Sequence, residues 1–182
     1  MNEIASKGQL RLSYLRWALV TVPLILFLGF MSGQMANSGY SNRWFVALNK
    51  PELMPPAIAF PVVWSILYIL LGLSLAIVIH ARGARYRGIA IAVFLVQLAC
   101  NLAWSPLFFA AHQVTQALML ILGMIALTIV TIALFFAVRR QAGLMLIPYL
   151  AWLCFAAWLN YEIHVLNPDA ETLVAPALRT HI

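Results

Sequence analysis

The side chains in this sequence that could build a binding site are mostly aromatic and recur at helical spacing. Phe60, Trp64 and Tyr68 are four residues apart, so a helix would present them on one face. The segment just before them, 51–56, contains three prolines, each of which fixes φ and lacks a backbone donor. A rigid loop leading into an aromatic helix face can wall a cavity for a flat apolar ligand. An interface loop followed by an ordinary packed helix explains the pattern equally well.

A stripe of polar side chains is the second candidate. Gln97, Asn101 and Ser105 are spaced by four residues within the block QLACNLAWSPLFF. Polar groups deep in a membrane rarely face lipid. These three either hydrogen-bond to neighbouring helices, at roughly 0.6 kcal/mol each, or face a ligand. The sequence does not decide between the two interpretations, and both can hold together.

The last apolar segment places a small residue beside a large aromatic one. Tyr149, Trp152, Ala156, Leu159 and Ile163 follow helical spacing on one face. Ala156 leaves a notch one turn beyond the Trp152 indole. The notch suits a neighbouring helix or a ligand, and the sequence alone favours helix packing.

Conventional acid–base or metal chemistry has few candidate residues. Asp and Glu total five, and they form no paired carboxylates, nucleotide-binding loop or Ser-His-Asp set. His80, His112 and His164 lie near predicted helix ends without the spacing of a metal motif, so we expect no metal site. Cys100 and Cys154 both lie within apolar segments and predict no disulfide framework.

The composition is that of an integral membrane protein. Hydrophobic residues make up 64% of the chain and charged residues 9%, against about 25% charged in soluble domains. The net charge of +6 does not indicate nucleic-acid binding, because the charges cluster at the ends of apolar runs. The first apolar run is too long for a cleaved signal sequence and indicates a retained span.

Five apolar runs are each close to the roughly 20 residues that a helix needs to cross a bilayer. Helix is required there because backbone groups in hydrocarbon must be satisfied within the segment. The fold class is therefore an all-α membrane protein, a bundle of five transmembrane helices. We predict a polar lead at 1–14, spans at 15–35, 57–80, 89–111, 116–138 and 144–166, a long loop at 36–56, and a polar, poorly ordered tail at 167–182.

The distribution of basic residues predicts an orientation. Eight Lys and Arg residues lie on the side of the N-terminus and three on the other side. This bias predicts the N-terminus inside, and it favours the inner membrane of a bacterial envelope. Two small-residue pairs, Gly29 with Gly33 and Ala99 with Ala103, permit close helix approach either within one chain or between two.

Three blocks resemble the TspO/translocator protein family, also called tryptophan-rich sensory proteins or peripheral-type benzodiazepine receptors. They are WFVALNKPELMPPAIAFPVVWSILY, QLACNLAWSPLFF and PYLAWLCFAAWLN, and the resemblance covers 29–167. It implies a receptor or sensor, usually a homodimer, that binds porphyrin or haem as a ligand and requires no cofactor. The implied function extends to transport of the ligand. The loop after the first span would be the lid. The implied ligand-binding residues are Trp44, Phe45, Pro51, Pro55, Pro56, Trp64, Gln97, Asn101, Trp104, Trp152, Ala156 and Leu159.

Two other function classes remain open. Some bacterial members of the family degrade porphyrin in light, and the resemblance would then make Trp64 and Trp152 the photochemical residues. The third class is a scaffold protein whose cavity is incidental. Of the three, the receptor is our leading expectation.

The sequence departs from the family at three places. Leu53 stands where Trp is common, and Phe45 stands where Tyr is frequent, so a phenolic hydroxyl is absent. No Lys or Arg soon follows Tyr161, so the sterol-recognition pattern of the animal proteins is missing and we do not predict sterol binding.

The residues themselves agree with a porphyrin ligand. A flat macrocycle with two carboxylates needs aromatic walls and cations at the mouth. Trp64, Trp104 and Trp152 can supply walls, and Arg43 and Lys50 can meet propionates. Alternatively, Arg43 and Lys50 are loop cations in the head-group region.

Overall fold

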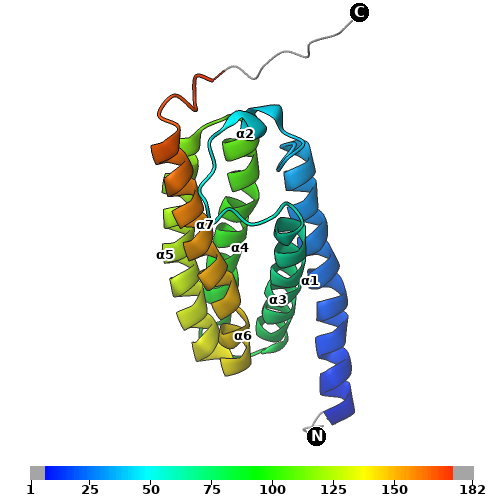
Figure 1. Cartoon of the computed structure of the whole chain (residues 1–182). Helices are drawn as coiled ribbons and strands as arrows, with labels where there is room; N and C mark the ends of the chain where they lie inside the picture. Colours follow the sequence, from blue (N-terminus) through cyan, green and yellow to red (C-terminus); the bar gives the residue numbers. More distant parts are fainter. Residues whose placement is uncertain (1–6, 174–182) are drawn as a thin grey trace, which may run out of the picture.

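Five long helices lie side by side in a bundle (Figure 1). The computed structural model describes residues 7–173, which contain helices and no strand. The five helices are long and apolar enough to cross a membrane, as the sequence predicts. They are α1 (Lys7–Met35), α3 (Ala59–His80), α4 (Arg87–Ser105), α5 (Val114–Val138) and α7 (Ile147–Leu166).

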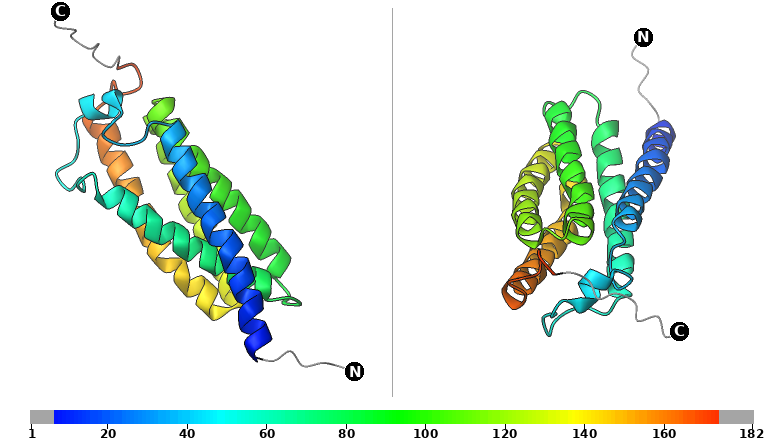
Figure 2. Two further views of the ribbon diagram at one scale, coloured as in Figure 1. Left: turned by 90° about the vertical axis from the view of Figure 1, so that its right-hand side faces the viewer. Right: turned by 90° about the horizontal axis from the view of Figure 1, so that it is seen from above.

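Three short elements complete the bundle. The helix α2 (Arg43–Ala47) lies in the long connection after α1. The π-helix η1 (Pro106–Ala110) extends α4, and α6 (Arg140–Met145) leads into α7. Around the bundle, contacts run from α1 to α3, α7, α5, α4 and back to α1, and α2 lies at the end where α7 finishes (Figure 2).

The ends of the chain differ in part from the prediction. The helix α1 begins at Lys7, inside the predicted polar lead. Residues 167–173, which the sequence places in a poorly ordered tail, form turns that pack on the bundle, and Ala170 is only 3% exposed. The rest of the lead and of the tail, 1–6 and 174–182, lies outside the described residues.

The helices α1 and α3 meet with their backbones in close contact. The Thr21 hydroxyl donates a hydrogen bond of 2.7 Å to the carbonyl oxygen of Gly72. A Cβ atom on Gly72 would stand 2.6 Å from the Cα atom of Val22. A Cβ on Gly29 would likewise overlap the Tyr68 ring. Gly29 therefore serves packing inside one chain, whereas Ala99 and Ala103 are exposed on α4.

Candidate functional site

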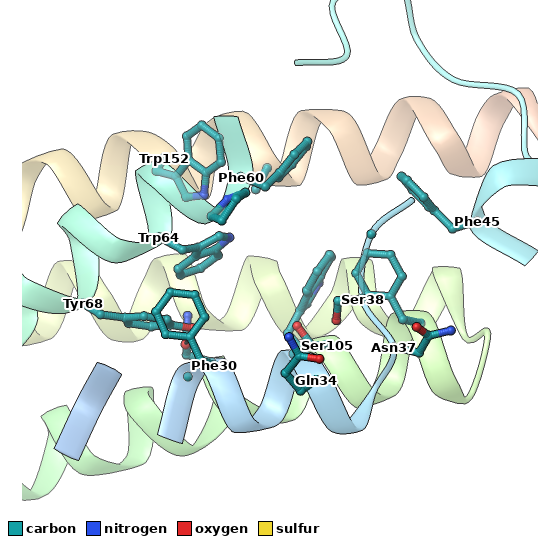
Figure 3. A pocket seen from close by; sticks show the side chains of 18 of the residues that line it. Phe30, Gln34, Asn37, Ser38, Phe45, Phe60, Trp64, Tyr68, Ser105 and Trp152 are labelled. Carbon is teal, nitrogen blue, oxygen red and sulfur yellow. Dashed lines mark hydrogen bonds between the residues drawn. The ribbon is translucent and has the colours of Figure 1, made fainter. Parts of the chain in front are cut away.

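A cavity of about 410 Å³ lies in the half of the bundle next to α2 (Figure 3). Its volume falls in the usual range for sites that take a small ligand or cofactor. It is bordered by α1, α3, α4, α7 and the connection between α1 and α3, residues 36–58, which we call the lid. Ile121 and Met124 of α5 also reach the cavity, as does Ala156 of α7. Most of its lining is aromatic or polar and includes Phe30, Gln34, Asn37, Ser38, Tyr40, Ser41, Phe45, Phe60, Trp64, Tyr68, Asn101, Trp104, Ser105 and Trp152.

The aromatic face of α3 forms one wall of this cavity. Phe60, Trp64 and Tyr68 all border it, as expected from their spacing of four residues. The ring centroids of Trp64 and Tyr68 are 5.1 Å apart. From α7, Trp152 meets Phe60 edge to face at 6.1 Å, and Phe30 of α1 approaches from the opposite side (Figure 3). Three helices therefore supply one continuous aromatic surface.

The polar stripe of α4 divides between packing and the cavity. The Tyr149 hydroxyl accepts hydrogen bonds from the side-chain amides of Gln97 and of Asn101, the latter at 3.0 Å. The Tyr68 hydroxyl donates to Asn101 Oδ1 at 3.2 Å. Gln97 thus joins α4 to α7, Asn101 both joins helices and lines the cavity, and Ser105 lines the cavity. Both interpretations of the stripe hold, at different residues.

Two indole N–H groups at the cavity have no hydrogen-bond partner among residues 7–173. Trp104 Nε1 and Trp152 Nε1 are buried, unpaired donors, and Ser38 Oγ is also unpaired. All three residues line the cavity. An unmatched buried donor costs about 1–3 kcal/mol, and a ligand that carries acceptors would remove that cost. Among the lining residues none is charged, so the site is an apolar pocket with a few neutral polar groups.

The lid is fastened through α2. The Asn42 side chain accepts a hydrogen bond from the Phe45 amide at 3.1 Å, which caps α2, and donates to the Phe109 carbonyl at 2.9 Å. Trp44 Nε1 donates to the carbonyl oxygen of Ala170 at 2.8 Å. Its ring stacks on His112 with centroids 4.3 Å apart. These contacts fix α2 in place, with Phe45 at the cavity.

The turns that follow α7 hold the lid from the other side. Asn167 accepts a hydrogen bond from the Asn49 amide at 2.7 Å and donates to the Asn49 carbonyl at 2.9 Å. Glu171 accepts from the Thr115 amide at 2.9 Å, at the N-terminus of α5. Hydrogen bonding from Thr115 holds the pKa of Glu171 below its ordinary value. Residues 167–173, which we call the latch, therefore connect the lid to two helices.

Half of the predicted ligand-binding residues lie away from the cavity. Trp44 is held by the latch, Gln97 by Tyr149, and Leu159 is buried within the bundle. Pro51, Pro55 and Pro56 belong to the part of the lid that runs outside the cavity and shape its path. The predicted residues that do line the cavity are Phe45, Trp64, Asn101, Trp104, Trp152 and Ala156.

The two predicted propionate-facing cations do not line the cavity either. Lys50 Nζ donates to the carbonyl oxygens of Phe45, Val46 and Leu48, and lies 4.7 Å from the centroid of the Phe45 ring. Lys50 therefore caps the C-terminal end of α2, and its partial burial lowers its pKa. Arg43 is exposed on the same helix.

The departures from the family pattern have small consequences for the cavity. Leu53 is 68% exposed and lies outside it. Phe45 brings no hydroxyl, but Tyr40 lines the cavity beside it, with ring centroids 5.4 Å apart. A phenol is thus present next to Phe45, from a different position of the lid.

The sequence prediction missed the contribution of α1 and the residues after it. Phe30, Gln34, Asn37 and Ser38 line the cavity, whereas the sequence indicated only a spanning and a helix-packing role for the first apolar run. A signal was present, because Phe30 and Gln34 are four residues apart and so share a helix face. Figure 3 shows Phe30 beside Tyr68 and Gln34 near Ser105, both on the cavity side of α1.

The histidines have separate local contacts. His112 stacks on Trp44, His164 Nδ1 lies 3.4 Å from Thr115 Oγ1, and His80 Nδ1 lies 3.1 Å from Ser13 Oγ at the opposite end of the bundle. Within residues 7–173, no group of three His, Cys, Asp or Glu side chains is arranged to hold a metal ion.

Low pH should loosen the lid through His112. Burial lowers the pKa of His112, so the stacked ring prefers to be neutral. Its contribution to lid stability is complete above the ordinary pKa of about 6.5 and is lost as the pH falls below that value. We expect the protection factors of the α2 amides, which are exchange rates corrected for the intrinsic effect of pH, to decrease as the pH falls from about 7.5 to about 5.

The matched variant for this prediction is His112→Asn. His112 has a φ of 56°, and Asn tolerates that left-handed backbone while lacking the imidazole. The α2 amides of the variant should have lower protection factors than those of wild type at neutral pH, and these should not decrease further at low pH. An equal pH response in both proteins would show that another group controls the lid.

The amino-acid sequence is similar to those of known proteins over most of its length. The family model described as the TspO/MBR family matches residues 19–166. Protein CrtK of Rhodobacter capsulatus is 36% identical, across 72% of this chain and 83% of the relative. Tryptophan-rich protein TspO of Chlorobaculum tepidum is 34% identical, across 81% of this chain and 93% of the relative. Translocator protein of Homo sapiens is 34% identical, across 74% of this chain and 80% of the relative.

Proposed function

Because the chain belongs to the TspO/MBR family, we propose that it is an integral membrane receptor or sensor that binds a tetrapyrrole, porphyrin or haem, in the cavity beneath the lid. The observation that carries the proposal is an aromatic cavity with two unpaired indole donors, Trp104 and Trp152. A flat macrocycle would cover the α3 wall and accept hydrogen bonds from indoles that otherwise have no partner.

The carboxylates of the ligand would bind elsewhere than at Arg43 and Lys50, the two cations expected from the sequence. With Lys50 bound to carbonyl groups, the donors at the lid end of the cavity are neutral and come from Gln34, Asn37 and Ser38. They lie on the last turn of α1 and the start of the lid, close to one end of the bundle. Propionates directed there would bind through amides and hydroxyls and could remain partly in contact with water.

The test is a titration of the purified protein with protoporphyrin IX in the dark. Saturable binding supports the proposal, and porphyrin uptake that only tracks the amount of detergent contradicts it. Ala156→Phe should weaken binding about tenfold, because the new ring enters the notch at the cavity wall. The matched control is Ala151→Phe, on the lipid-facing side of the same helix, which should bind like wild type.

One observation favours a second candidate function, light-dependent oxidative degradation of the porphyrin. Trp64, Trp104, Trp152 and Tyr68, all of which can lose an electron, border the same cavity. Illumination of the protein–porphyrin complex separates the two functions. A new absorbing product that forms only in light, and fails to form in a Trp64→Phe variant that still binds porphyrin, would favour the enzyme.

The remaining expectations are part of the proposal and have separate tests. Transport requires ligand movement across vesicles that contain the protein. A homodimer requires twice the chain mass by light scattering in detergent.

Location in the inner membrane with the N-terminus inside is supported by the charges, since Arg82, Arg85 and Arg139 lie at the N-terminal end of the bundle. A scaffold role would be favoured if Ala156→Phe and wild type behaved identically.

A further inference from the structure

A second hollow lies at the opposite end of the bundle from the lid. It is a groove of about 720 Å³ lined by residues of α1, α3, α6 and the start of α7. Figure 1 shows that α6 and the adjoining ends of α1 and α3 lie at the end of the bundle opposite α2. The polar side chains that line the groove are Tyr14, His80, Arg139 and Gln141. It shares no lining residue with the tetrapyrrole cavity.

The groove is polar at one end and apolar along its length. His80 is the last residue of α3, and Arg139 lies between α5 and α6, so both are at helix ends. Ile77 and Leu70 also line the groove and precede His80 in α3 by three and ten residues. The apolar wall therefore extends about 15 Å along the helix from His80. Leu144 faces them from α6. A polar end at the membrane surface with an apolar channel below it has the form of a lipid molecule.

The charge at this end is strongly positive. Arg82, Arg85, Arg87 and Arg140 belong to the same end as Arg139. Arg87 is bound to the Ile79 carbonyl at 3.0 Å, whereas Arg139 is exposed at the edge of the groove. The acidic residues of the described range all belong to the lid, the end of α7 or the latch, at the other end: Glu52, Glu162, Asp169 and Glu171.

We propose that this groove is a binding site for one anionic phospholipid. Its phosphate binds the guanidinium of Arg139, with Gln141 and Tyr14 as further donors. One acyl chain lies along Leu70, Ile77 and Leu144. Within residues 7–173 the arginines of this end have no carboxylate near them, and this excess of positive charge selects a head group with net negative charge over a zwitterionic one.

Native mass spectrometry of the detergent-purified full chain tests the site with two lipids of identical acyl chains, phosphatidylglycerol and phosphatidylcholine. We expect one phosphatidylglycerol to remain bound at concentrations where phosphatidylcholine does not. Arg139→Gln should weaken phosphatidylglycerol binding about fivefold. The control Arg82→Gln removes the same charge from an exposed position of the same end outside the groove, and should change binding little.

A second pair of variants tests the apolar part. Leu144→Trp should reduce phosphatidylglycerol binding by obstructing the groove, and Leu122→Trp, at a similarly exposed leucine of α5, should not. Equal retention of the two lipids would overturn the proposal, because the site would not select an anionic head group. Equal losses of phosphatidylglycerol in Arg139→Gln and Arg82→Gln would also overturn it, in favour of diffuse electrostatic attraction to this end of the bundle. Porphyrin binding should be unchanged in Arg139→Gln, so the lipid site and the cavity can fail independently.

Discussion

Trp152→Ala should weaken porphyrin binding about 30-fold, the largest loss that we expect from a single change at the cavity. Trp152 supplies part of the aromatic wall and one of the two unpaired indole donors. Truncation of a tryptophan at the centre of a binding surface costs about 2 kcal/mol or more, which corresponds to this factor. Binding should be followed by the absorbance of the porphyrin, because the mutation itself removes a source of tryptophan fluorescence.

The matched control is Trp158→Ala on the same helix. Trp158 is 36% exposed and does not line the cavity, although its ring is connected to Trp152 through Phe155. Trp158→Ala should bind porphyrin like wild type. If the two variants lose affinity equally, the porphyrin binds on the outer face of α7 and not in the cavity.

Gly72→Ala should destabilise the bundle by about 1–3 kcal/mol, the largest effect on stability that we expect from adding a single methyl group. The new Cβ would stand 2.6 Å from the Val22 backbone, so α1 and α3 would have to separate. The hydrogen bond from Thr21 to the Gly72 carbonyl would lengthen with them. The measurement is the midpoint of thermal unfolding in a fixed detergent.

Gly123→Ala is the control for helix propensity. A Cβ at Gly123 would meet no atom within 4 Å, and the residue lies inside α5. Alanine should therefore stabilise that helix by up to about 1 kcal/mol. A lower midpoint of thermal unfolding for Gly72→Ala together with a higher midpoint for Gly123→Ala would establish the close contact of α1 with α3. A Gly72→Ala protein as stable as wild type would show that the two helices have room between them.

The sequence predicts the five helices because their signal is local. Each span is a long apolar run whose backbone must be satisfied within the segment, and the structure begins and ends most of them within a few residues of the prediction. The aromatic face of Phe60, Trp64 and Tyr68 is also local, since helical spacing alone brings the rings together.

The site is only partly predictable because its other determinants join residues that are distant in sequence. Nothing local indicates that Lys50 is bound to carbonyl groups of α2 or that Trp44 Nε1 donates to Ala170. The carried-over residues included Trp152 and Ala156, which line the cavity, but omitted Phe30 and Gln34, because the motif blocks begin after α1. Packing of α1 against α3 is what brings that first helix to the cavity.

The latch has a consequence for the order in which the protein is made. The hydrogen bond from Trp44 to Ala170 spans 126 residues, and that between Asn49 and Asn167 spans 118. During synthesis the lid is present long before its partners leave the ribosome, and contacts between such distant residues form late in folding. The lid is therefore held to the latch only once the final helix has been inserted, so the covered cavity exists only in a chain that has been completely assembled in the membrane.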